Sequence, residues 1–358
     1  MVWLDSEENA YRKHPAIRFA IVAFAAQHGW RAYHFENIAA MAESARDKCL
    51  QLIKTRAQEM TEKVAEGVDL DSHSDIADAE WMLASILIIN NYENARCRLE
   101  AAEGHRQAAR TIVHIFNQSV STEGRELFAF LRNQLAIEDI IAATTTFDKA
   151  SIKNAITPAP GSDFLLFSKY LKLLHQITLE SIEHTHEGPH PTGPFESRLT
   201  LSTIHSEFEQ ARGTTLIAAG RLGLDGSMMA RDFVRLVEIY HNAGLLYALQ
   251  CLKCADEESA HWVTACTRLF DQLSRFEDVH AFVQNLAWPT FIAGTACFGN
   301  EERQTIITSM FTVIHEVTRF DYYLDVLDFL RNFWAGTNND WRSLAQTREA
   351  SGKRLFVV

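Results

Sequence analysis

Positive charge is scarce in this sequence. The 358 residues include 34 Lys and Arg against 46 Asp and Glu, which gives a formal net charge of −12. No basic run or basic stripe interrupts this acidic balance. Affinity for nucleic acid rests on clustered Lys and Arg that neutralise phosphates. We therefore expect these residues to have no DNA affinity of their own.

Cysteine is also sparse, and we expect neither a metal site nor a cofactor. One lone C-x-x-C has no second pair to complete a zinc site, and no βαβ pattern indicates a thioredoxin site. The His-rich segment 184–194 holds one E-x-x-H spacing but no second copy, so it is predicted to be a solvated loop. An apolar helical context predicts reduced, buried thiols in an intracellular protein. The cysteines are Cys49, Cys97, Cys251, Cys254, Cys266 and Cys297.

Long hydrophobic runs and catalytic fingerprints are missing. The longest apolar runs, such as 81–89, are far below the roughly 20 residues that span a bilayer, so no membrane span is expected. The acidic first eight residues show no signal peptide. The nucleophile elbow, the phosphate-binding loop and the dinucleotide fingerprint are all lacking. The prediction is that the chain is not an enzyme, with an α-helical enzyme kept as an alternative.

Helical periodicity is what the sequence does contain. Apolar residues recur at helical spacing in segment after segment, and no alternating strand pattern occurs. This predicts an all-α fold, a single large domain of roughly a dozen helices over 1–358. Composition predicts flexible loops near 66–75, 157–163 and 184–197 and a frayed polar tail after 335. Helices are expected at 15–33, 35–65, 76–94, 99–117, 123–145, 164–182, 198–222 and 230–252, with one or two over 255–282.

The stretch 286–300, L-A-W-P-T-F-I-A-G-T-A-C-F-G-N, concentrates the most unusual residues. Pro289 suits the first turn of a helix, where its missing N–H costs nothing. Gly294 leaves room for a neighbouring backbone to approach closely. Gly299 is expected at the C′ position, and Asn300 at the N-cap of the next helix. The stretch therefore predicts a short, buried helix followed by a well-capped one.

This stretch also resembles a known family. W-P-x-F-I-A-G at 288–294, E-E-R at 301–303 and an amphipathic segment ending near Trp334 resemble the end of the fungal-specific transcription factor domain. That domain is the regulatory region of fungal six-cysteine zinc-cluster regulators. Looser helical patterns extend the resemblance over most of the chain, at 79–93, 105–112, 139–142 and 238–247. The six-cysteine cluster itself is missing from this chain.

The resemblance implies a regulatory domain that binds an effector or dimerises. It implies a small apolar effector, a homodimer, and contacts with co-regulators or the transcription machinery. DNA would be reached only through a zinc-cluster segment that this chain lacks. The nucleus is the expected compartment, and shuttling with the cytoplasm is compatible with it. A non-enzymatic scaffold or assembly protein with the same fold is the main alternative.

Eight residues are candidates for the lining of an effector pocket. The last third of the chain carries a stripe of aromatic and Met residues, and similar domains are thought to receive small molecules in a helical cavity. The competing interpretation is a filled core, because pockets and cores are both mainly apolar in composition. The candidates are Trp288, Phe291, Gly294, Cys297, Met310, Tyr323, Phe329 and Tyr247.

Overall fold

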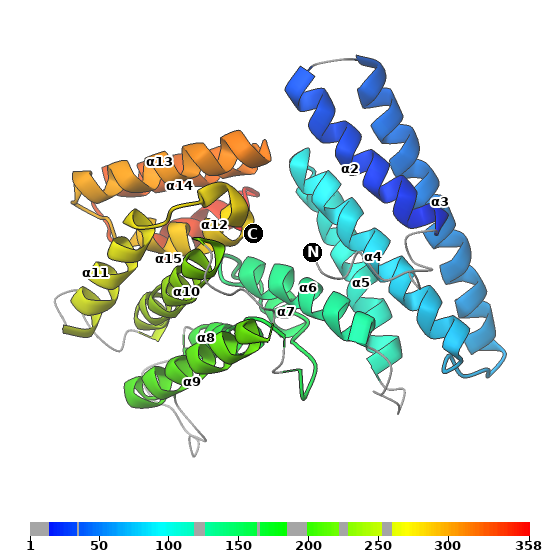
Figure 1. Cartoon of the computed structure of the whole chain (residues 1–358), viewed down its shortest axis with the longest axis horizontal. Helices are drawn as coiled ribbons and strands as arrows, with labels where there is room; N and C mark the ends of the chain where they lie inside the picture. The colour runs from blue at the N-terminus through cyan, green and yellow to red at the C-terminus, as the bar shows by residue number, and fades with distance from the viewer. Residues whose placement is uncertain are drawn as a thin grey trace. The chain divides into compact units, whose positions relative to one another are not determined.

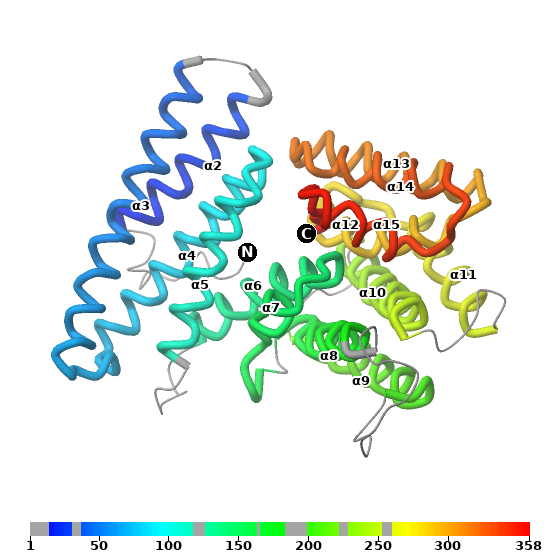
Figure 2. Tube along the Cα trace, turned by 180° about the vertical axis from the view of Figure 1, so that it is seen from behind, coloured from blue at the N-terminus to red at the C-terminus, as the bar shows by residue number. Residues whose placement is uncertain are grey.

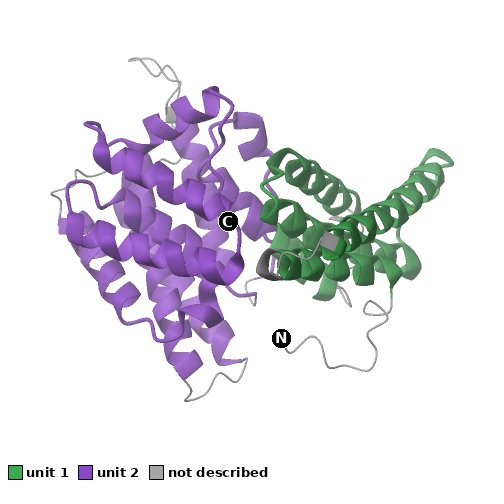
Figure 3. Cartoon of the chain, turned by 90° about the horizontal axis from the view of Figure 1, so that it is seen from above, with its two compact units in different colours: residues 1–135 green, residues 136–358 purple. Residues whose placement is uncertain are grey.

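The computed structural model describes residues 14–33, 36–117, 126–162, 165–184, 199–221, 228–252 and 260–358. For 31–33, 36, 117 and 183–184 it describes the backbone alone. Fourteen α-helices and no strand occupy these described residues (Figure 1). The all-α prediction is therefore confirmed. The domain consists of two compact helical units, 1–135 and 136–358, which divide within α6 (Glu126–Ala143; Figure 3).

Unit 1 is built around α4 (His73–Ala95), whose middle, residues 81–89, is apolar on nearly all sides. In Figure 1, α2 and α3 run side by side as a hairpin, and α2 also packs against α4, which in turn packs against α5. Trp81, Met82, Leu83, Ile86 and Ile89 of α4 are all buried, as expected for a helix without a polar face. The helices are α2 (Pro15–Tyr33), α3 (Glu36–Ala65), α4 (His73–Ala95) and α5 (Leu99–Asn117), followed by the start of α6.

Unit 2 is organised around α10, which packs against α8, α9, α11 and α12 (Figure 2). Gly244 of α10 allows the Phe208 ring of α9 to lie directly against the helix, where a Cβ atom would collide with it. The remaining helices are α7 (Lys149–Lys153), α8 (Ser168–His184), α9 (Leu201–Gly220), α10 (Met228–Leu252), α11 (Ala260–Ser274), α12 (Val279–Thr295), α13 (Glu301–Thr318), α14 (Tyr322–Ala335) and α15 (Trp341–Ala350).

Several predicted helix starts differ from those in the structure, and specific contacts account for two of them. The helix expected from residue 164 begins at Ser168, because Ser162 donates its hydroxyl to the carbonyl of Ala159 in its own turn instead of capping a helix. Pro289 lies inside α12 and not in its first turn. That helix begins ten residues earlier, where the carboxylate of Asp278 accepts from the N–H of Ala281.

The turn after α12 confirms one expectation and corrects another. Asn300 caps α13, since its side-chain oxygen accepts from the N–H of Arg303. Gly299 has a left-handed φ of 73°, which favours glycine, but it lies beyond the C′ position because the C-cap is Ala296.

The predicted frayed tail after 335 is wrong. Residues 341–350 form α15, and Leu355, Phe356 and Val357 are buried. The hydroxyl of Tyr323 donates to the carbonyl of Val358 over 2.6 Å. Several polar residues of α15 are exposed, while buried Trp341 and Ala345 and the apolar residues at 355–357 anchor the tail to unit 2. The predicted loop 66–75 is non-helical over 66–72, and α4 begins at His73. The predicted loop 157–163 is non-helical over 157–162. Of the remaining predicted loop residues, His184 is the last residue of α8, and 163 and 185–197 lie outside the described residues.

Candidate functional site in unit 2

All eight candidate pocket residues lie in unit 2 and are buried. Met310 is the most exposed of those with a side chain, at 9%, so none of them faces solvent. Four helices contribute them, together with the turn after α12. Trp288, Phe291 and Gly294 lie on α12, Cys297 in the following turn, Met310 on α13, Tyr323 and Phe329 on α14, and Tyr247 on α10.

An aromatic layer along α12 includes four of these residues, in two pairs of contacting rings. The indole of Trp288 stacks on Tyr240 at 5.7 Å and meets the edge of Tyr247 at 6.1 Å. Phe291, one turn further along α12, contacts Phe329 at 6.1 Å between ring centroids. Such pairs add to the stability that comes from burial alone. The layer therefore joins α10, α12 and α14 through the predicted residues.

Two other candidates lie apart from the aromatic layer. Tyr323 belongs to a second ring cluster with Phe311, Phe320 and Tyr322. The thiol of Cys297 donates to the carbonyl of Ala293 at 3.1 Å, within its own turn, and burial raises its pKa to about 12. It is therefore a neutral, inert thiol at physiological pH.

Gly294 is a point of close helix packing. A Cβ atom added there would lie 2.7 Å from Cδ1 of Leu330 on α14 and 3.2 Å from Cγ2 of Ile307 on α13. The predicted close approach is therefore real, but side chains make it and not a backbone. The carbonyl of Gly294 also accepts from the indole N–H of Trp334 at 2.9 Å.

The polar groups around the aromatic layer are mostly satisfied within unit 2. The indole N–H of Trp288 donates to the hydroxyl of Thr144 at 3.0 Å, and the hydroxyls of Tyr247 and Thr178 are 2.9 Å apart. Burial raises the pKa of Tyr247, so its phenol stays neutral. The layer is a neutral interior in which the polar groups of Trp288 and Tyr247 both have partners.

Thr290 is the exception in this interior. The residue is 0% exposed, and its hydroxyl has no hydrogen-bond partner in the described part of the chain. By contrast, the buried Thr295 and Thr318 donate to helix carbonyls at 2.7 Å. An unpaired buried hydroxyl costs about 1–3 kcal/mol. Thr290 lies one turn before Gly294 on α12, between Pro289 and Phe291, and it is one of two threonines in a mainly apolar stretch.

Arg342 was missed by sequence reasoning because its segment was predicted to be frayed. Its guanidinium donates to the thiol of Cys251 at 2.5 Å and to the hydroxyl of Ser181 at 2.6 Å, and lies over the ring of Phe147. Cys251 and Ser181 lie in the last turns of α10 and α8, so the cation is placed at two helix C-termini. Helix dipoles favour a cation there. Arg342 is thus a clamp that joins α8, α10 and α15.

Nearly all of the chain, and not only unit 2, is similar to one known protein family. A family described as the fungal specific transcription factor domain matches residues 9–357, nearly the whole chain. The chain belongs to this family. No curated protein matches it, and no solved structure matches it. As a fungal specific transcription factor domain, the chain has a regulatory role in transcription.

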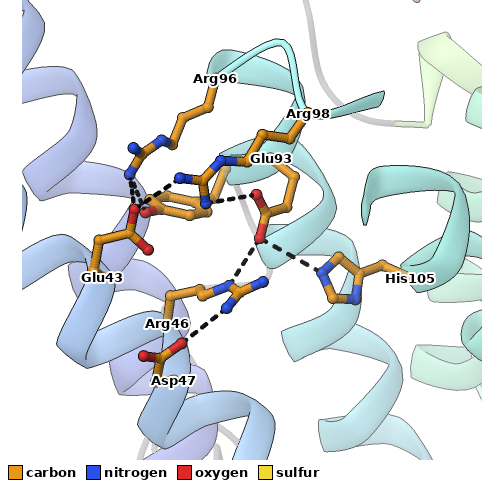
Figure 4. A network of polar contacts seen from close by, with 8 residues as sticks. Glu43, Arg46, Asp47, Glu93, Arg96, Arg98 and His105 are labelled. Atoms are coloured by element: carbon orange, nitrogen blue, oxygen red, sulfur yellow. Dashed lines mark hydrogen bonds and ion pairs between the residues drawn. The ribbon is translucent and has the colours of Figure 1, made fainter. Parts of the chain in front are cut away.

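In this transcription factor domain, unit 1 carries a separate buried ionic network (Figure 4). Glu93 of α4 has a fully buried side chain and accepts from Nε of Arg46 on α3 at 2.8 Å. Arg98 and His105 approach the same carboxylate at 3.6 and 3.7 Å. Burial raises the pKa of Glu93, but His105 and Arg46 outweigh it and hold the pKa below its usual range. The network therefore links α3, α4 and α5 through an ionised carboxylate.

Metal ligation and membrane insertion find no support in the described residues. No group of three or more His, Cys, Asp or Glu in the described ranges is arranged to hold a metal ion. No described helix of the transcription factor domain is long and apolar enough to cross a bilayer. His186 of the E-x-x-H spacing and Cys254 of the C-x-x-C lie outside the described residues.

Proposed function

We propose that unit 2 is the effector-receiving part of a fungal transcription regulator and that α12 is the helix that faces the effector. The observation that carries the proposal is the unpaired hydroxyl of Thr290, which lies among the predicted pocket residues Trp288, Phe291 and Gly294. Apolar binding sites commonly use a few placed polar groups to orient the ligand. A small apolar effector with one hydrogen-bonding group fits this chemistry.

The energetics of Thr290 support a binding role over a purely structural one. A valine has nearly the same shape as threonine and leaves no hydroxyl to desolvate, so a core under selection for stability alone would favour it. Retaining a costly group inside a packed core is typical of sites where function opposes stability. Binding would supply the missing hydrogen bond and shift the population towards one packing of α12 against α13 and α14.

The remaining parts of the proposal rest on the family and on charge. We infer that the domain acts in the nucleus as a homodimer, with co-regulators or the transcription machinery as partners. The net charge of −12 supports DNA contact through a zinc-cluster segment and not through these residues. A scaffold with the same fold is the alternative, and it needs no polar group in the core of unit 2.

The test compares Thr290→Val with Thr318→Val. Thr318 is also buried, but its hydroxyl donates to Ile314 and accepts from the N–H of Phe320, so its loss should lower the free energy of unfolding by about 1 kcal/mol. Thr290→Val should keep or raise the melting temperature and yet weaken the transcriptional response of the full regulator in cells. Native mass spectrometry should show a small molecule that co-purifies with wild type and Thr318→Val and is depleted in Thr290→Val.

Two outcomes would reject the effector role of Thr290. The first is a more stable Thr290→Val variant with an unchanged response, because the hydroxyl would then be dispensable. The second is a lower melting temperature with an unchanged response, because the hydroxyl would then have a structural partner such as a buried water.

A further inference from the structure

A second candidate binding site lies on unit 2, in the groove between the end of α14 and the start of α15. Its volume is about 250 Å³, and segment 332–347 alone supplies its walls. This volume is below the range of about 300–1,000 Å³ that is usual for drug-sized ligands, so the groove suits a smaller molecule. The lining residues are Asn332, Phe333, Gly336, Thr337, Asn338, Ser343, Leu344 and Thr347.

The lining is neutral and rich in hydrogen-bonding groups. It contains no Asp, Glu, Lys, Arg or His. The side chains of Asn332, Thr337 and Ser343 make no hydrogen bond within the described part of the chain, and all three are exposed. Asn338 uses only its carbonyl oxygen, which accepts from the N–H of Asp340 at 2.9 Å, so its amide N–H groups are available. Donors and acceptors therefore line the groove without a net charge.

An apolar side chain completes the groove. Leu344 is 37% exposed although it is a large aliphatic residue. Phe333 also lines the groove, and it is almost fully buried and packed against Phe298 at 5.5 Å between ring centroids. A ligand that suits this floor needs an apolar patch of its own in addition to several hydroxyl groups.

Both walls of the groove are held in place by the rest of unit 2. On α14, the indole N–H of Trp334 donates to the carbonyl of Gly294 at 2.9 Å. On α15, the indole N–H of Trp341 donates to Gln250 at 3.0 Å, and the carboxylate of Asp340 accepts from the N–H groups of Arg342 and Ser343. A ligand would thus enter a preorganised site and lose less free energy to ordering it.

We propose that this groove binds a small neutral polyol of the monosaccharide class. The C–H face of a sugar ring matches Leu344, and its hydroxyls match the amide and hydroxyl groups of the walls. An anion would lack a countercharge here, and a wholly apolar ligand would desolvate several polar groups without pairing them. The proposal is independent of an effector at α12, because the two sites share no residue.

The test is ligand-observed saturation-transfer NMR on the full chain. The probes are D-glucose and myo-inositol at about 10 mM, a concentration suited to millimolar affinity, with D-glucose 6-phosphate and D-gluconate as charged counterparts. The variants are Asn332→Ala/Ser343→Ala, which removes two wall groups, and Leu344→Ala, which removes the floor. The matched control is Thr305→Ala/Thr312→Ala, two exposed threonines of α13 outside the groove.

We expect saturation transfer from at least one neutral probe with wild type and the control. Each groove variant should weaken that binding about tenfold while its melting curve stays near that of wild type. The charged counterparts should bind at least tenfold more weakly than the neutral probes. The proposal is overturned if neither neutral probe shows transfer, if charged and neutral probes bind equally, or if the groove variants bind as the control does.

Discussion

Gly294 offers a direct measurement of how tightly α12 is packed. In Gly294→Ala, the new Cβ would lie 2.7 Å and 3.1 Å from the two terminal carbons of Leu330, closer than carbon atoms can approach without a shift. Leu330 is fully buried, so its side chain cannot swing into solvent to relieve the contact. The substitution therefore has two opposite effects on stability: alanine raises helix propensity, and its methyl group overpacks the core.

The magnitudes of these effects decide the expected sign. Alanine in a helix interior is favoured over glycine by about 1 kcal/mol. Overpacking a dense core by a methyl group costs about 1–3 kcal/mol. Gly294→Ala should therefore lower the free energy of unfolding by up to about 2 kcal/mol. Gly213→Ala is the matched control, because a Cβ at Gly213 of α9 would meet nothing within 4 Å and should stabilise by up to about 1 kcal/mol.

Calorimetric melts of both variants measure the difference, and a double-mutant cycle assigns it. Leu330→Ala alone should cost about 2–5 kcal/mol, since it opens a cavity. In the Gly294→Ala/Leu330→Ala double variant, the new methyl group has the space it lacked, so the combined loss should be at least about 1 kcal/mol smaller than the sum of the single losses. Equal melting temperatures for Gly294→Ala and Gly213→Ala, together with additive losses in the cycle, would refute the packing argument. Gly294→Asp should be more severe than Gly294→Ala, because it adds an unpaired carboxylate to an apolar setting.

Two further predictions concern the ionic network and the tail. The pKa of Glu93 is held below its unfolded value of 4.5, so its contribution to stability is present above that pH and is lost as the pH falls through the folded pKa. Glu93→Gln should therefore lower the melting temperature at pH 7 and reduce the further drop that wild type shows as the pH falls below 4.5, and an unchanged drop would show that Glu93 does not carry it. Truncation after Arg354 removes three buried apolar side chains, each worth about 1.5–3 kcal/mol, and should unfold or strongly destabilise unit 2. A wild-type melting curve for the truncated chain would mean that the tail does not anchor unit 2.

Helix positions were predictable where periodicity was strong. The segment 99–117 was predicted with the bounds that α5 has, because its apolar residues recur on one face and its ends coincide with those of the pattern. The cap at Asn300 was predictable for a similar reason, since an N-cap acts on residues only three positions away. The start of α12 was missed because Pro289 was taken to mark a helix start, whereas Asp278 caps a helix that begins ten residues earlier.

The candidate site was predictable only in its composition. The stripe of aromatic residues identified side chains that are buried together in unit 2, such as Trp288 and Phe291. It did not separate the aromatic layer from the second cluster around Tyr323, because membership depends on which helices lie side by side. Arg342 was out of reach for the same reason, since its partner Ser181 lies 161 residues away in the chain.

The sequence by itself determined the all-α class, most helix positions and the family resemblance, because these depend on residue types and on spacings of three or four residues. The tertiary structure decided which glycine is in close contact with its neighbours, which hydroxyl is left unpaired and which arginine joins three helices. Gly294 and Gly213 both belong to helices, Gly294 near the end of α12 and Gly213 in the middle of α9. The close contact at Gly294 and the open space at Gly213 depend on what α12 and α9 pack against, and residues distant in the sequence determine that packing.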